Sequence, residues 1–81
     1  MAEKKRTFAA IAADIRSDWL NVYFGAVPYL EAMLTLDTVD PEASYINVSA
    51  RDVVTYFLAN ANTFRGAKAK KLKAELKSMI Q

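Results

Sequence analysis

The sequence predicts an all-α protein, a compact bundle of about four helices. Apolar residues recur at spacings of three and four along several segments, as on the buried face of an amphipathic helix. Glycines and prolines fall where one such segment ends or the next begins. The length of 81 residues suits a single domain, whose core buries roughly 60 to 65% of the surface that the unfolded chain exposes.

The first helix is expected over residues 7–24. Thr7 is a suitable N-cap, and Gly25 is a suitable place to stop, because glycine readily takes the backbone conformation that ends helices. Between them one apolar stripe recurs at helical spacing, consisting of Phe8, Ala12, Ile15, Trp19 and Val22. The register of this helix is therefore well specified.

The second helix is expected over residues 28–36. Pro28 fits its first turn, where the missing N–H is not needed. Only Glu31 and Thr35 are polar, and both project from the same narrow side. We therefore expect this helix to be the central and most buried one.

Residues 37–48 are expected to form a long loop, with at most one helical turn that begins at Pro41. No helical or strand-like period is sustained here. We expect the apolar side chains of Tyr45, Ile46 and Val48 to pin the loop to the body of the domain.

The third and fourth helices are expected over residues 50–61 and 65–80. Ser49 followed by Asp52 is a capping-box pattern ahead of the third helix. Gly66 lies at the break between the two helices. The fourth helix carries one apolar face, formed by Ala69, Leu72, Leu76, Met79 and Ile80.

Composition excludes several classes of function. Because the chain has no cysteine and no histidine, it lacks disulfides, thiolate nucleophiles, imidazole bases and the usual zinc ligands. The paired carboxylates Asp14 and Asp18 have nothing that would push their pKa values apart, as acid–base catalysis requires. The acidic loop lacks the template of a calcium site, and no glycine-rich phosphate loop occurs. We expect no enzyme, no cofactor and no metal.

The location is expected to be cytoplasmic. No segment matches a signal peptide, and the least polar run, residues 19–36, is interrupted by polar residues, glycine and proline, so we expect no membrane span. The net charge of +2 is uneven: residues 1–6 carry +2, residues 7–52 carry −5 and residues 53–81 carry +5. Residues 1–6 are expected to be a flexible basic arm.

Several stretches carry a resemblance to a known group of proteins. They are Ile11 to Arg16, Trp19, Tyr23 to Met33, Tyr56 to Ala61 and Thr63 to Gly66. Together they resemble small, functionally uncharacterised helical proteins encoded by phages and mobile elements of Gram-positive bacteria. The resemblance implies a bacterial cytoplasm and the role of a binder of host or phage factors, including inhibitors of host defence. It assigns no functional residue.

Two surfaces are candidates for binding. The first consists of Leu20, Tyr23, Phe24 and Arg65, since aromatic and arginine side chains dominate interaction hot spots, whereas Trp19 and Tyr29 fall on predicted core faces. Arg65 can instead brace the domain by pairing with Asp52 or another acidic residue of the middle segment.

The second candidate is the basic final helix. Lys70, Lys73 and Lys77 fall within about 60° of one another on an ideal helix, while Lys68 and Lys71 lie on the opposite flank with Glu75. Such lysines, with the Lys4-Lys5-Arg6 arm, can track phosphates, or they can be a solvated face. We therefore predict a protein-interaction module with an unidentified protein partner and leave self-association open. The alternative is a small nucleic-acid-binding protein that reads no sequence.

Overall fold

The computed structural model of the chain describes residues 6–80, so the predicted contacts of Lys4 and Lys5 lie outside the described residues. Within that range the chain forms four helices and a two-stranded antiparallel hairpin, and the predicted all-α fold is confirmed. The helices are α1 (Phe8–Asp18), α2 (Val27–Leu34), α3 (Ala50–Ala59) and α4 (Ala67–Ile80), and the strands are β1 (Ser44–Tyr45) and β2 (Val48–Ser49).

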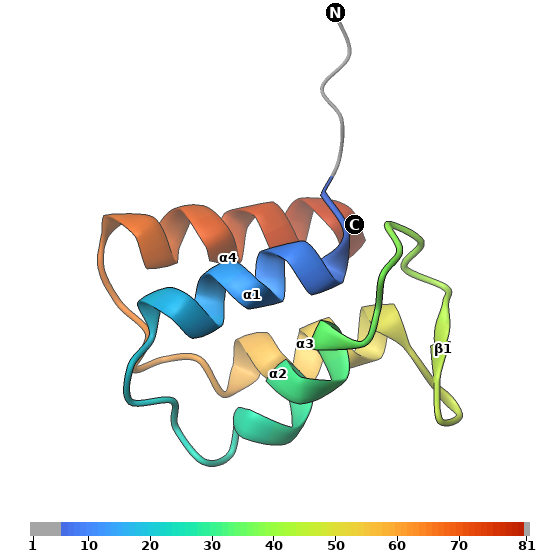
Figure 1. The fold of residues 1–81 in the computed structure, drawn as a ribbon, viewed down its shortest axis with the longest axis horizontal. Coiled ribbons are helices and arrows are strands. Elements are labelled where there is room, and N and C mark those ends of the chain that lie inside the picture. The colour runs from blue at the N-terminus through green and yellow to red at the C-terminus, as the bar shows by residue number, and fades with distance from the viewer. Residues whose placement is uncertain (1–5, 81) are drawn as a thin grey trace, which may run out of the picture.

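The helices surround one apolar core. Both α1 and α3 pack against α2 and α4, so each helix has two main neighbours (Figure 1). α2 is therefore not the central helix that its composition predicts. It buries Leu30, Ala32 and Met33 but exposes Pro28 and Glu31. No helix within residues 6–80 is long and apolar enough to cross a membrane.

The first helix ends six residues before its predicted end. The Trp19 N–H still donates to Ile15 O, at 2.8 Å, but the Trp19 backbone is extended. Its indole stacks on Phe64, with 5.0 Å between ring centroids, and meets the edge of Phe57 at 6.2 Å. Burial of this large aromatic surface against α3 and the loop after it favours the departure from the helix.

The predicted N-caps are present at two helices. Thr7 Oγ1 accepts from the Ala10 N–H at 3.1 Å, and Ser49 Oγ accepts from the Asp52 N–H at 3.2 Å. Apart from the end of α1, the helix bounds lie within two residues of the predicted ones, and the start of α3 and the end of α4 agree with them. α4 begins at Ala67 rather than at residue 65 because Gly66 has a φ of +114°, which lies outside the helical region.

The predicted loop 37–48 contains a turn and most of the hairpin. The Ala43 N–H donates to Asp40 O at 3.1 Å, which makes a tight turn at Pro41 instead of a helical one. Ser44 pairs with Ser49 across the two strands, and the turn residues Ile46 and Asn47 both have positive φ. Val48 packs against the core as predicted, whereas Ile46 is 76% exposed, so its predicted anchoring role is wrong.

Arg51 ties this segment to the bundle. Its guanidinium donates to Glu42 Oε2, at 3.2 Å from Nε and 2.5 Å from Nη2, and also to the backbone carbonyl of Ile80. One side chain of α3 therefore joins the turn before the hairpin to the end of α4. The arrangement fixes the hairpin end of the domain, at the right of Figure 1, opposite the α1–α2 connection.

Candidate binding surface

The connections α1–α2 and α3–α4 lie at the same end of the bundle, at the left of Figure 1. The first connection presents Leu20, Tyr23 and Phe24, which are 86%, 43% and 80% exposed. The Tyr23 and Phe24 ring centroids lie 4.9 Å apart. We call these three residues the apolar patch. The predicted exposure of these side chains is thus found, while Trp19 is buried and Tyr29 is partly buried.

The apolar patch is held by its flanks. Trp19 and Ala26 are buried on either side of it. The Ala26 N–H donates to Tyr23 O at 2.8 Å, and the Val27 N–H donates to Phe24 O at 3.3 Å. A connection that is hydrogen-bonded and anchored at both ends loses less conformational entropy when it binds a partner than a mobile loop does.

Gly25 brings the patch against the end of α3. A Cβ at this position would lie 2.6 Å from a Tyr23 ring carbon and 3.0 Å from Asn60 Oδ1, both closer than ordinary contact. The absence of a side chain lets the Tyr23 ring lie over Gly25. Beside Tyr23 is a pocket of about 270 Å³, whose other walls are Ala59, Asn60, Asn62 and Thr63.

A second hollow lies between α3 and α4, with a volume of about 550 Å³. Four cations line it, and none of the residues that line it is acidic. We call this hollow the cationic groove; its cations are Arg65, Lys70, Lys73 and Lys77, and its other walls are Leu58, Asn62, Phe64, Gly66 and Ala74. The three lysines that were predicted to form a stripe therefore line one groove, and Arg65 lines the same groove.

Lys73 lies closest to the apolar part of this groove. Its Nζ is 5.7 Å from the centroid of the Phe64 ring, which allows a cation–π contact. Partial burial lowers the pKa of Lys73, and the positive charge of Arg65 lowers it further. The groove thus concentrates positive charge next to apolar surface.

Arg65 does not brace the domain in the predicted way. It is exposed, and its Nε donates to the backbone carbonyl of Asn62 at 3.2 Å. The ion pairs within residues 6–80 are Arg6–Asp14, Arg6–Glu75 and Arg51–Glu42, so the considered pairing with Asp52 or the acidic middle is not formed. The Arg65 guanidinium instead borders the cationic groove.

Lys68 and Lys71 lie on the other flank of α4. They border a different hollow of about 610 Å³ between α1 and α4, together with Arg6, Asp14 and Glu75. Because this hollow mixes both signs of charge, the two lysines do not extend the cationic groove. As predicted, Lys68 and Lys71 lie on the same flank as Glu75. They are apart from Lys70, Lys73 and Lys77.

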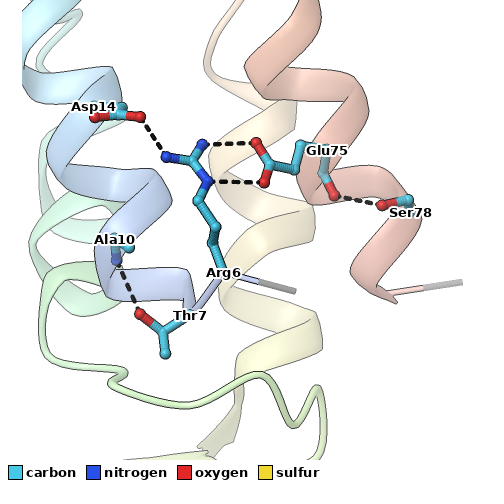
Figure 2. Close-up of polar contacts among 6 residues, drawn as sticks. All are labelled: Arg6, Thr7, Ala10, Asp14, Glu75 and Ser78. Carbon is cyan, nitrogen blue, oxygen red and sulfur yellow. Dashed lines mark hydrogen bonds and ion pairs between the residues drawn. The ribbon is translucent and has the colours of Figure 1, made fainter. Parts of the chain in front are cut away.

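Arg6 is engaged with the bundle and is not part of a free arm. Its Nε and Nη2 donate to the two oxygens of Glu75, at 3.0 and 2.7 Å, and its Nη1 donates to Asp14 at 2.5 Å (Figure 2). The hydrogen bonds to Glu75 and, to a smaller extent, to Asp14 raise the pKa of Arg6 above its already high ordinary value. The predicted flexible arm is therefore wrong at Arg6, because two carboxylates on different helices hold the guanidinium.

This ion-pair cluster makes a testable contribution to stability. We expect Arg6→Gln to lower the free energy of unfolding by about 1 kcal/mol, since partly exposed pairs contribute little each and the pairing with Glu75 is bidentate. Urea denaturation of Arg6→Gln, Glu75→Gln and the double variant measures the coupling between the two side chains. A coupling that is zero at low salt, or that does not fall as salt is added, would contradict this prediction.

No group of three or more carboxylates that could hold a metal ion occurs in the part of the chain that the structure describes. Comparison with family models, with curated proteins and with solved structures finds no match. The apolar patch and the cationic groove are the two distinctive features of this surface.

Proposed function

We propose that this chain is a non-enzymatic protein-interaction module. The observation that carries the proposal is the apolar patch, in which Leu20 and Phe24 project from an anchored connection into solvent. Consistent with the resemblance to proteins of phages and mobile elements, the proposed partner is a host or defence factor in a bacterial cytoplasm. The acidic pair Asp14 and Asp18 offers little to an enzyme, because Arg6 engages the Asp14 carboxylate.

The apolar patch has the properties of an interaction hot spot. Burying an exposed leucine or phenylalanine side chain is worth about 1.5–3 kcal/mol. Aromatic anchors at the centre of an interface contribute more than most other residues, because they remove a large area from water. The bonded backbone around Tyr23 and Phe24 further lowers the entropic cost of binding.

The test compares the patch with a matched exposed residue elsewhere. Phe24→Glu and Leu20→Glu change the patch, and Ile46→Glu makes the same type of change in the hairpin turn. Each purified variant is used as bait in a Gram-positive bacterial lysate, and bound proteins are identified by mass spectrometry. We expect the wild type and Ile46→Glu to retain the same partner, and the patch variants to lose it.

Two further measurements complete this test. Circular dichroism and thermal unfolding verify that the variants are folded, since substitutions of exposed side chains change stability by about 0.5 kcal/mol or less. Light scattering detects a partner that is a second copy of this chain, in which case Phe24→Glu turns a dimer into a monomer. A strictly monomeric protein that retrieves no partner, or one whose partner is retained by both patch variants, would contradict the proposal.

A further inference from the structure

The cationic groove begins beside the α3–α4 connection, at the end of the bundle that carries the apolar patch, and runs along α4 to Lys77. Asn62 borders the cationic groove and also the pocket beside Tyr23. The connection α3–α4 therefore joins the two sites without an intervening ridge of acidic residues among those that line them. A partner that covers Tyr23 therefore lies beside the border of the groove at Asn62.

The lining of the groove is complementary to a ligand that is both anionic and apolar. Four cations form its charged border, whereas Leu58, Phe64 and Ala74 supply apolar wall. Nucleic acid would neutralise the cations through its phosphates but would leave the apolar wall without a counterpart. Single-stranded nucleic acid also stacks its bases on exposed aromatic rings, and Phe64, the aromatic residue of this groove, is only 2% exposed.

The three lysines also match the period of a helix. Lys70, Lys73 and Lys77 are spaced i, i+3, i+7 on α4 and extend over about 10 Å of its length. A second helix laid along the groove presents carboxylates at the same spacing when its acidic residues recur every three or four positions. Its neighbouring apolar residues then face the wall formed by α3 and α4. The volume of about 550 Å³ is of the size that accommodates several side chains.

We propose that the cationic groove binds an acidic, amphipathic helical segment of a protein partner. This inference rests on the proposed function and specifies the chemistry of the partner. Apolar residues of the segment pack on Leu58 and Ala74, while its carboxylates pair with the lysines and Arg65. The charges steer association and set the orientation of the segment.

The probe is a synthetic helical peptide of about 20 residues with a leucine face and glutamates at i, i+3, i+7 beside it. A second peptide carries glutamine in place of each glutamate. Fluorescence anisotropy measures the affinity of each for the full chain at low and high salt. We expect only the acidic peptide to bind tightly, and its affinity to fall as salt screens the charges.

Two double variants with the same change in net charge test the location. Lys70→Glu with Lys77→Glu reverses two cations of the groove, and Lys68→Glu with Lys71→Glu reverses two cations outside it. We expect the first to weaken peptide binding at least about tenfold and the second by less than about threefold. Equal losses would mean that the overall field attracts the peptide, which would overturn the proposal.

Ala74→Gln distinguishes binding of an amphipathic segment from binding of nucleic acid. Ala74 is exposed in the apolar wall, so glutamine there makes the wall polar without changing the net charge. We expect it to weaken binding of the acidic peptide and to leave binding of a DNA oligonucleotide unchanged, because DNA binding depends on charge. If Ala74→Gln leaves peptide binding unchanged, or if DNA binds the wild type more tightly than the peptide does, the proposal fails.

The outcome also distinguishes this inference from the proposed function. If the acidic peptide fails to bind while Phe24→Glu still abolishes capture of the partner, the inference fails and the protein-interaction function stands. If neither the peptide binds nor the patch variants affect capture, both fail.

Discussion

Phe57→Ala is expected to lower the free energy of unfolding by about 3–5 kcal/mol, the usual cost of removing a buried phenylalanine. Phe57 is fully buried on α3 and meets the edge of Trp19. A domain of this size has a total stability near the lower end of about 5–15 kcal/mol. The variant should therefore be partly or wholly unfolded at 37 °C.

The measurement is urea denaturation followed by circular dichroism and by the fluorescence of Trp19, the single tryptophan of the chain. Phe24→Ala is the matched control, because it makes the same chemical change at an exposed position. We expect it to alter stability by about 0.5 kcal/mol or less. A loss at Phe24 as large as that at Phe57 would contradict the apolar patch, and a loss at Phe57 as small as that expected at Phe24 would contradict the core.

The core of α1 could be predicted from the sequence, but its end could not. Phe8, Ala12 and Ile15 recur with the helical period, and all are buried. Trp19 continues that period and is also buried, although its backbone has left the helix. The helical period therefore predicts that Trp19 is buried but not where the helix ends. The end of α1 depends on the aromatic partners that α3 and its following loop provide, which periodicity along one segment does not reveal.

The hairpin was missed for a local reason. Its strands are two residues long, too short to show an alternating pattern. Its turn places Ile46 and Asn47 at positive φ, where the usual sequence signal is Asn-Gly or Asp-Gly. A β-branched residue at this position gives no such signal.

Only the part of the candidate site that lies on one helix could be predicted from the sequence. The positions of Lys70, Lys73 and Lys77 relative to one another follow from helical geometry. The apolar wall beside them depends on how α3 packs against α4, and the role of Arg65 depends on where Gly66 ends the connection. Arg6 pairs with Glu75, 69 positions along the chain, and no short-range pattern indicates that contact.

The two glycines of this end of the bundle are expected to respond differently to alanine. Gly66 has a φ of +114°, and a Cβ there would meet nothing within 4 Å. The cost of Gly66→Ala is therefore one of backbone strain, about 1–3 kcal/mol. At Gly25 the obstacle is contact, chiefly with the exposed Tyr23 ring, which can rotate away at a lower cost.

We therefore expect Gly66→Ala to lower the free energy of unfolding more than Gly25→Ala, as measured by urea denaturation. Gly66 also sets the start of α4 and borders the cationic groove beside Arg65, so a backbone that relaxes at Gly66 moves Arg65 relative to Lys70. Gly66→Ala should then weaken binding of the acidic peptide even where the protein is fully folded, whereas Gly25→Ala should act on the apolar patch through Tyr23. A Gly66→Ala variant with wild-type stability would contradict the strained φ, and with it the position of Arg65 in the groove.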